Sequence, residues 1–409
     1  MLKNYFKIAI AVLRRRKFFT FISLFGISFT LTILLVLTAF LDKIAGDSYP
    51  DRKRDRSLYI SRIQQKSKNG QNSGTMSFYY LDHYVRTLKT PVKLGISSMF
   101  SGTNTYVNNK KIAVSYKYTN NDYWDIMDYD FIEGKTFSRQ QLANADKVAV
   151  ISEDMKKQYF GDMPSVVGKY IEADNVKYRV TGVVKNVPIT SYMTYSDIYL
   201  PYTVSKSDVT KGKGYQGGFY GILLADSKND VQRMHDEYEG LVKRLPMESK
   251  EFYKISSHAD PYIVSYVDTG NDDLSGVTIV LTAIGIFTLL VTLLPTLNLV
   301  NINITRIMER SSEIGVRKAF GASSGTLVYQ FIVENIILTL LGGLIGIVLS
   351  FIAIQVLNSM NLIPNLILSI NFTVLAIGLL ICFFFGLLSG VYPAWRMSKL
   401  NVVTALKAQ

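Results

Sequence analysis

The chain contains few of the residues from which disulfides and metal sites are built. Its 409 residues include one cysteine, Cys382, and three histidines. A single cysteine excludes a disulfide within the chain and any zinc site based on paired cysteines. His83, His235 and His258 show no paired ligand spacing. The sequence therefore offers no candidate metal site, and any large domain in it must be stabilised by its hydrophobic core.

Motifs for nucleotide hydrolysis and catalysis are also missing. A P-loop needs two glycines with four residues between them, followed by Lys and then Ser or Thr, so that backbone amides can surround phosphates. The nearest segment, VVGKY at 166–170, has Tyr170 in place of the hydroxyl residue and no glycine at the required upstream position. No nucleophile elbow, His-Glu zinc helix or dinucleotide fingerprint occurs. We expect no catalytic residue and no cofactor, hence a chain that is not an enzyme.

Charged residues are scarce and unevenly distributed. They make up 19% of the chain, against about 25% in typical soluble domains. None occurs at 18–41, 274–305 or 335–395, which are stretches of 24, 32 and 61 residues. One membrane-spanning helix needs about 20 consecutive apolar residues. The sequence therefore predicts four spans, at 18–41, 275–300, 327–357 and 372–392.

The excess of basic residues lies mainly beside these spans. The net charge is +13, of which 1–17 carries +6, 301–325 carries +2 and the tail 393–409 carries +3. Cytoplasmic segments next to spans are typically rich in Lys and Arg. We therefore expect both termini and 301–325 in the cytoplasm, with 42–273 and the short turn 358–371 outside. Because the basic charge is explained in this way, a nucleic-acid partner is not expected.

The segments outside the spans differ in their predicted structure. Residues 1–17 have the pattern of a basic amphipathic helix in the membrane interface. Residues 42–273 contain short segments in which apolar and polar residues alternate, which indicates half-buried strands. Strands are predicted at 57–63, 147–152, 177–184 and 197–202, and helices at 76–89, 153–160 and 227–245. This is the pattern of an α+β domain. We expect two subdomains, since no single sheet would readily hold so many short strands.

One cytoplasmic segment has the features of a docking helix. In ERSSEIGVRKAFGAS, at 309–323, Glu309, Glu313 and Arg317 recur every four residues and so share one helix face. Glu313 preceding Arg317 is the favourable order for such a pair. Gly321 is suited to end the helix before the third span. Two interpretations remain open: a charged helix that joins two spans, or a helix that receives force from a soluble partner.

A few residues within the predicted spans could matter for helix packing or function. Gly342 and Gly346, like Gly386 and Gly390, form pairs of small residues one turn apart that allow helices to approach closely in lipid. We favour packing within one bundle over a dimer contact. Glu334 is the only acid or base within the predicted spans. A charge at such a position is costly and often functional, but structural pairing is an equally good interpretation.

Several motifs resemble those of one transporter family. The run 309–346, from ERSSEIGVRK to LTLLGGLIG, closely resembles the signature of MacB- and FtsX-type ABC transporter permeases. The ending GLLSGVYPAWRMSKLNVVTALK, at 386–407, is similar to the family's last span and terminal element, with Asn401-Val402 where a proline is usual. In the large domain, DYWDIMDYDFIEGKTFS (122–138) and KVAVISEDMKKQYFGD (147–162) resemble the MacB-like extracytoplasmic core. The likeness covers nearly the whole chain.

This resemblance implies a fold and an assembly. The fold would be an α-helical membrane protein with four transmembrane helices and a large α+β extracytoplasmic domain between the first and second spans. That domain would have porter-like and Sabre-like subdomains, the latter at about 110–200. The permease would pair with a second copy or a homologous permease and with a separate cytoplasmic ABC ATPase that binds ATP. The residues implied in coupling to that ATPase are Glu309, Glu313, Ile314, Gly315, Arg317, Lys318 and Gly321.

The resemblance also implies a function, with two alternatives. In the leading hypothesis, ATP-driven motion is transmitted across the inner membrane to the periplasmic domain, for efflux through a periplasmic adaptor and an outer-membrane channel. The first alternative is a lipoprotein-releasing permease of the LolC/LolE kind, which shares the topology. The second is a signalling protein like FtsX, which the size of 42–273 disfavours, because outer domains of that kind are generally smaller. The sequence does not identify the substrate.

Overall fold

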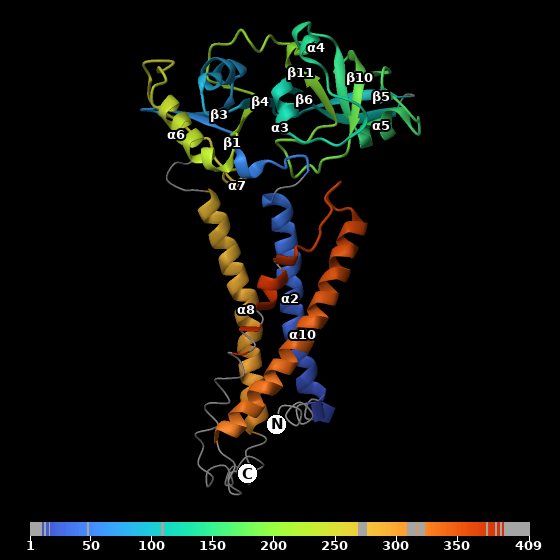
Figure 1. The fold of residues 1–409 in the computed structure, drawn as a ribbon, viewed down its shortest axis with the longest axis vertical. Coiled ribbons are helices and arrows are strands. Elements are labelled where there is room, and N and C mark those ends of the chain that lie inside the picture. Colours follow the sequence, from blue (N-terminus) through green and yellow to red (C-terminus); the bar gives the residue numbers. More distant parts are fainter. Residues whose placement is uncertain are drawn as a thin grey trace. The chain divides into compact units, whose positions relative to one another are not determined.

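The computed structural model divides into two compact units (Figure 1). It describes residues 10–11, 14–15, 17–46, 49–107, 110–268, 276–308, 316, 324–373, 375–380, 383–384 and 387. The first unit, here called the helical unit, comprises Met1–Asp42, Leu281–Leu362 and Ile367–Gln409. The second, the sheet unit, comprises Lys43–Val280 and Ile363–Leu366.

Three long apolar helices form most of the described part of the helical unit. They are α2 (Lys17–Ala45), α8 (Gly276–Met308) and α10 (Ser324–Met360). By length and composition, all three could cross a membrane. They correspond to the first three predicted spans, and α8 continues past the predicted end of its span. Of the fourth predicted span, 372–392, the structure describes only residues 372–373, 375–380, 383–384 and 387, so this span stays a prediction.

The sheet unit is built on strands that join in one hydrogen-bonded sheet. The described residues contain 14 strands. Neighbouring strands in the main path follow the order β14-β2-β3-β13-β4-β6-β11-β8-β10-β7. Off this path, β1 pairs with β13, β12 with β3, β5 with β6 and β9 with β10. Their bounds are β1 Ser57–Ile60, β2 Ile63–Ser67, β3 Gly70–Met76, β4 Lys93–Ser98, β5 Ser101–Val107, β6 Lys110–Thr119, β7 Phe131–Gly134, β8 Val148–Ser152, β9 Tyr170–Ala173, β10 Val176–Val184, β11 Ile198–Pro201, β12 Gln216–Gly217, β13 Phe219–Leu224 and β14 Phe252–Ser257.

This single sheet corrects the expectation that the strands could not share one sheet. It consists of two halves, one from strands within 57–98 and 216–257 and the other from strands within 101–201. β4 and β6 join the halves through one register pair, Ser97 with Thr119. Figure 1 places β3 and α6 towards one end of the sheet unit and β10, β5 and α5 towards the other. The porter-like and Sabre-like names stay predictions.

Short helices pack on the sheet and are fixed by local signals. They are α3 (Asn121–Ile126), α4 (Arg139–Ala143), α5 (Glu153–Phe160), α6 (Val231–Val242) and α7 (Tyr262–Tyr266). The α5 helix occupies the predicted range 153–160, because the Ser152 hydroxyl accepts a hydrogen bond from Met155 N at its start and Gly161, with a φ of 67°, follows its end. The predicted helix at 76–89 is instead a π turn at Tyr80–Tyr84 and a 3₁₀ turn at Val85–Thr87.

The strand β8, inside the 101–201 half, is buried on both faces. Along β8 the side chains alternate between two hydrophobic clusters, with Val148 and Val150 in one and Ala149 and Ile151 in the other. This explains why the strand is apolar throughout rather than alternating with polar residues. A third cluster, which includes Met234 and Tyr238 of α6, covers the other half. These clusters give the sheet unit an extensive core.

Candidate functional site

A buried ion pair lies at the C-terminal end of α2, within the sheet unit. The Arg54 Nε donates to Asp51 Oδ2 at 3.0 Å, and the two side chains are only 6% and 1% exposed. The Arg54 Nη1 also donates to the carbonyl of Ile44 at 3.0 Å and to that of Gly46. Carbonyls at the end of a helix lack intrahelical partners and carry partial negative charge. The guanidinium therefore caps α2 where its last turn enters the sheet unit.

Two tyrosines complete this cluster, which we call the α2 junction: Asp51, Arg54, Tyr59 and Tyr262. The Tyr59 hydroxyl donates to Asp51 Oδ2 at 2.6 Å. The Arg54 Cζ lies 3.6 Å from the centre of the Tyr262 ring, a close cation–π contact. The two rings meet edge to face, with centroids 5.3 Å apart. The junction thus joins the end of α2 to β1, which carries Tyr59, and to α7, which carries Tyr262.

The electrostatics of the junction favour the charged form of Arg54 and the neutral form of Tyr59. Burial disfavours the charged form of Arg54, but the neighbouring Asp51 carboxylate outweighs it, so the pKa of the guanidinium is raised. Burial, and then the charge of Asp51, raise the pKa of the Tyr59 hydroxyl well above its ordinary value. Removing one partner of such a buried pair typically costs about 3–5 kcal/mol. A variant that removes only Asp51 or only Arg54 should therefore be strongly destabilised.

From the junction, contacts continue into the sheet. The backbones of Tyr59 and Asp260 exchange hydrogen bonds of 2.7 and 3.0 Å, and Ser265 Oγ of α7 donates to Tyr59 O at 2.9 Å. β1 pairs with β13 from Ser57–Leu224 to Ile60–Gly221. The end of α2, β1 and α7 are thus linked by hydrogen bonds within the sheet unit.

Sequence reasoning missed this junction. Arg54 stands in PDRKRDR, at 50–56, where consecutive charges have the pattern of an exposed loop. Nothing in that run distinguishes Arg54 from Arg52, which pairs with Asp130 at the surface. The available signal was position only, since the run closely follows the first span.

The predicted coupling residues cannot be placed. Of 309–323, the structure describes only residue 316. Outside the described residues lie Glu309, Glu313, Ile314, Gly315, Arg317, Lys318 and Gly321, and also Gly386 and Gly390 of the fourth predicted span. Their roles stay predictions.

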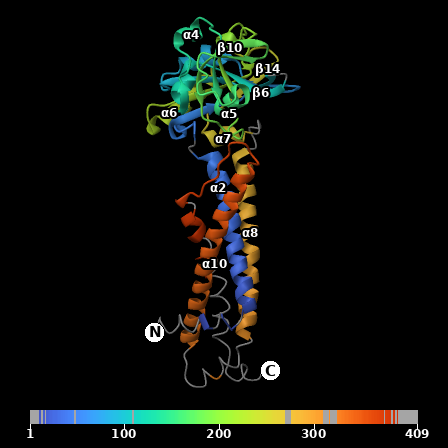
Figure 2. The same ribbon diagram turned by 90° about the vertical axis from the view of Figure 1, so that its right-hand side faces the viewer.

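The other glycine pair lies against α2 of the same chain. A Cβ built on Gly342 would lie 2.8 Å from the Ile27 Cβ, and one on Gly346 would lie 3.0 Å from the Leu31 Cβ. The Thr32 hydroxyl also donates to the Gly346 carbonyl at 3.3 Å. In Figures 1 and 2, α2 and α10 cross each other. The two glycines therefore bring the backbone of α10 against α2.

Glu334 lies inside the helical unit. Its side chain belongs to α10 and is 2% exposed. One turn further along α10, Leu338 is buried in a cluster with Ile337 that includes Leu24 of α2. The carboxylate thus lies on the part of α10 that packs within the bundle. Whether it acts in function or only in packing stays a prediction.

Two further features were considered as ligand sites. In the described part of the chain, no group of three His, Cys, Asp or Glu side chains could hold a metal ion. A cavity of about 220 Å³ is lined by Arg86, Asn120, Asn121, Asp122, Arg139, Leu142 and Tyr202. Both of its arginines contact Asp122, at 3.5 and 3.3 Å. Arg86 also pairs with Asp82 at 2.7 Å, and Arg139 lies 3.7 Å from Asp125, which leaves little charge to attract an anion.

Two family models match the chain in succession. Residues 20–241 match the MacB-like periplasmic core domain, and 285–402 match the FtsX-like permease C-terminal domain. The chain belongs to the MacB/FtsX family of ABC transporter permeases. The resemblance inferred from the motifs is confirmed. This permease is accordingly a membrane protein with a large extracytoplasmic domain, and the match to 20–241 identifies the sheet unit as that domain.

Curated relatives agree with the family. The permease is 25% identical to the macrolide export ATP-binding/permease protein MacB of Acinetobacter baylyi, over 100% of this chain and 60% of that protein. It is 26% identical to the ABC transporter permease YknZ of Bacillus subtilis, over 70% of this chain and 68% of that protein. It is also 28% identical to the pyoverdine export protein PvdT of Pseudomonas syringae, over 69% of this chain and 41% of that protein. The chain thus spans about 60% of the length of the MacB it matches.

Solved structures show weaker likeness. The periplasmic region of MacB from Actinobacillus actinomycetemcomitans is 16% identical, covers 49% of this chain and 88% of its own, and has a TM-score of 0.36. The extracellular domain of YknZ from Gram-positive bacteria is 17% identical, covers 48% of this chain and 99% of its own, and has a TM-score of 0.37. The family assignment rests on the family models.

Proposed function

We propose that this permease transmits the motion of a cytoplasmic ABC ATPase through its helices to the sheet unit, and so drives export of the MacB type. The observation that carries the proposal is the α2 junction. A single helix, α2, contains the first predicted span and ends at a buried ion pair that is bonded to β1 and packed on α7. Such a connection passes a helix movement to the sheet instead of absorbing it.

The partners follow from the family and from the missing P-loop. The relatives MacB and PvdT are named as export ATP-binding/permease proteins. The 409 residues contain no P-loop, so we propose that ATP is bound by a partner ATPase, docked on the segment from Glu309 to Gly321. We further propose a dimer with a second copy or a homologous permease. The complex would lie in the inner membrane with both termini cytoplasmic, and would work with a periplasmic adaptor and an outer-membrane channel.

The junction can be tested with Arg54→Ala in the complex of permease and ATPase in nanodiscs. A spin label on a cysteine at Lys213, an exposed position, in a Cys382→Ser background would report the distance between the sheet units of a dimer. We expect ATP to change this distance in the wild type and much less in Arg54→Ala, while ATP hydrolysis continues. Arg52→Ala removes a surface pair of Arg and Asp nearby and should behave like the wild type.

A destabilised variant has to be distinguished from an uncoupled one. Asp51→Asn with Arg54→Met removes both buried charges and avoids leaving one of them alone. If this double variant is as stable as the wild type and still fails to move its sheet unit, the ion pair itself is required for transmission. A full ATP-driven distance change in both the single and the double variant would contradict the proposal.

A further inference from the structure

A short turn between two predicted spans belongs to the sheet unit. The helix α10 ends at Met360 and the fourth predicted span begins at residue 372, so 361–371 connects them. Within this connection, Ile363–Leu366 groups with the sheet unit, whereas the residues on both sides of it group with the helical unit. We call Ile363–Leu366 the outer turn. The connection between these spans therefore contributes four residues to the extracytoplasmic domain.

A hydrogen bond holds the outer turn on α5. The Asn365 Nδ2 donates to Asp154 Oδ2 at 2.9 Å, and both residues are half-buried. Asp154 lies in the first turn of α5, and its own amide donates to the Asn186 Oδ1 at 2.8 Å. Met155, the next residue, is buried in one hydrophobic cluster with side chains of β8 and β10. Because hydrogen bonds to charged groups are stronger than those between neutral groups, the outer turn is well attached to a helix that is itself fixed on the sheet.

The backbone around Asn365 is shaped by local hydrogen bonds. Asn365 has a φ of 64°, in the left-handed region that asparagine adopts more readily than most residues. The Leu366 amide donates to the Ile363 carbonyl at 3.1 Å and closes the turn. The Asn358 side chain holds the backbone of Leu368 by two further bonds, at 3.0 and 2.9 Å. The turn is thus preorganised, which lowers the entropic cost of bringing the Asn365 side chain to α5.

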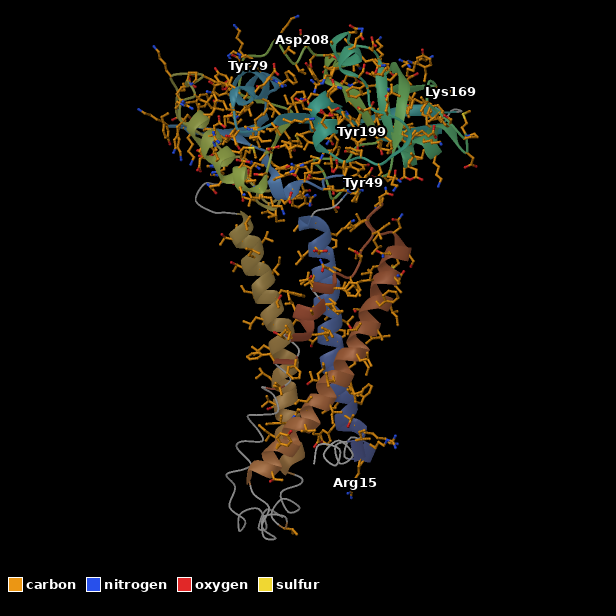
Figure 3. The ribbon with its side chains drawn as sticks, viewed as in Figure 1. Arg15, Tyr49, Tyr79, Lys169, Tyr199 and Asp208 are labelled. Atoms are coloured by element: carbon orange, nitrogen blue, oxygen red, sulfur yellow. The ribbon has the colours of Figure 1, made fainter. Side chains whose placement is uncertain are left out.

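The contact with α5 lies away from the α2 junction. The junction connects the end of α2 to β1 and to α7, whereas Asn365 meets α5. Figure 1 shows α7 and α5 in different parts of the sheet unit, and Lys169 in Figure 3 marks the end that holds α5 and β10. A body that is held at one point can pivot about that point, and a second attachment removes this freedom.

We propose that the outer turn is a second attachment of the sheet unit, which holds this unit in one orientation on the membrane helices through the bond from Asn365 to Asp154. The α2 junction fixes where the sheet unit is attached, and the outer turn fixes how the unit is rotated about that attachment. The inference goes beyond the proposed function, because this second attachment acts whether or not an ATPase is bound.

Exchanging the two side chains tests the bond itself. Asn365→Asp places two carboxylates against each other, which repel, while aspartate still tolerates a left-handed φ. Asp154→Asn combined with Asn365→Asp restores one amide and one carboxylate, with donor and acceptor exchanged. Glu153→Gln is the matched control, because it removes the other acid in the first turn of α5 and leaves Asn365 and Asp154 in place.

The orientation can be measured on the full-length permease in nanodiscs, without ATP or an ATPase. Spin labels on cysteines at Leu281 of the helical unit and Lys147 of the sheet unit, both exposed, report the distance between the two units. The background is Cys382→Ser, and dilution with unlabelled permease restricts the measurement to one chain. Hydrogen exchange of the Leu366 amide reports the attachment of the outer turn, and thermal unfolding verifies that each variant folds.

We expect Asn365→Asp to raise the exchange rate of the Leu366 amide by about tenfold or more and to broaden the distance distribution. The double variant and Glu153→Gln should resemble the wild type. A distribution in Asn365→Asp as narrow as that of the wild type would overturn the proposal, because the outer turn would then not hold the sheet unit. So would a double variant as broad as Asn365→Asp, or equal broadening in Glu153→Gln, since the bond would then not be the cause. No nucleotide is used, so a failure of transmission in the Arg54 experiments leaves these outcomes unaffected.

Discussion

Asn120 and Ile96 exchange two hydrogen bonds across the joint between the halves of the sheet. The Ile96 amide donates to the Asn120 Oδ1 at 2.9 Å, and the Asn120 amide donates to the Ile96 carbonyl at 3.1 Å. The Asn120 Nδ2 also donates to the carbonyl of Leu94 at 2.9 Å, while its Oδ1 accepts from Tyr123 N and so caps α3. β4 and β6 share only one register pair, so this side chain takes the place of missing strand pairing.

Asn120→Ala should therefore loosen the joint. It removes a helix cap, worth about 1 kcal/mol, and leaves a buried amide and carbonyl without partners, at about 1–3 kcal/mol for such groups. We expect a loss of about 2–4 kcal/mol in the free energy of unfolding of the sheet unit, measured by urea titration of the intact permease. Asn121→Ala removes one hydrogen bond, to the Phe137 carbonyl, and should cost about 1 kcal/mol. Equal effects would contradict the role given to Asn120.

Lys117 makes stability depend on pH. Its side chain is fully buried on β6, and Nζ donates to the Met193 carbonyl at 2.6 Å. Burial lowers the pKa of the ammonium group to about 7, whereas an unfolded chain has an ordinary lysine pKa of about 10.4. The unfolded state therefore binds the proton more tightly. Burying the charged lysine therefore lowers the free energy of unfolding. This loss is complete below about pH 7 and disappears as the pH rises towards 10.4.

Lys117→Met should remove this dependence. At 1.36 kcal/mol per pKa unit, the penalty at neutral pH is on the order of 4 kcal/mol, reduced in practice by the lost hydrogen bond to Met193. We expect the variant to be more stable than the wild type at pH 7 and the two to converge towards pH 10. Unfolding curves at several pH values would show this. A difference independent of pH between 7 and 10 would mean that the lysine does not titrate in this range.

Some elements of this structure could be predicted from the sequence alone, and others could not. Local signals were sufficient for α5 and β8, since a serine cap, a following glycine and an apolar run all lie within or next to the element. The sheet joint and the α2 junction depend on residues distant in the sequence, such as Tyr59 with Tyr262. Periodicity carries no information about such pairings. The apolar spans were predicted because a membrane imposes length and composition on each helix separately.

Gly342 provides a test of helix packing. Its built Cβ would lie 2.8 Å from both Cβ and Cγ2 of Ile27, closer than real contacts allow, so Gly342→Ala must push α10 away from α2. At the next residue, Gly343, a Cβ would make an ordinary contact of 3.5 Å with Leu379. We expect Gly342→Ala to lower the thermal stability of the permease in nanodiscs by several degrees, and Gly343→Ala to leave it nearly unchanged. If Gly342→Ala impaired only dimer formation, the glycine would be a contact between copies instead.

Variants in the predicted coupling segment can distinguish a helix that docks on the ATPase from one that only links two spans. If 309–318 only joins two spans, reversing a charge there should change little, because exposed pairs one turn apart are worth about 0.3–0.5 kcal/mol. If the segment docks into an ATPase groove, Glu313→Lys removes a favourable contact and adds a repulsive one. Losing a buried charge partner at an interface costs about 2–5 kcal/mol, or roughly 30- to 4,000-fold in affinity.

We therefore expect Glu313→Lys and Arg317→Glu each to insert into the membrane at the wild-type level and to lose co-purification of the ATPase. The Glu313→Lys, Arg317→Glu double variant adds a second control. It restores a helical pair in the less favourable reverse order, a difference of at most about 0.5 kcal/mol within an isolated helix, but it presents the wrong charges to a partner. Recovery of the complex in the double variant would mean that the pair stabilises only the helix. Continued loss, together with normal insertion, would mean that the two side chains contact the ATPase directly.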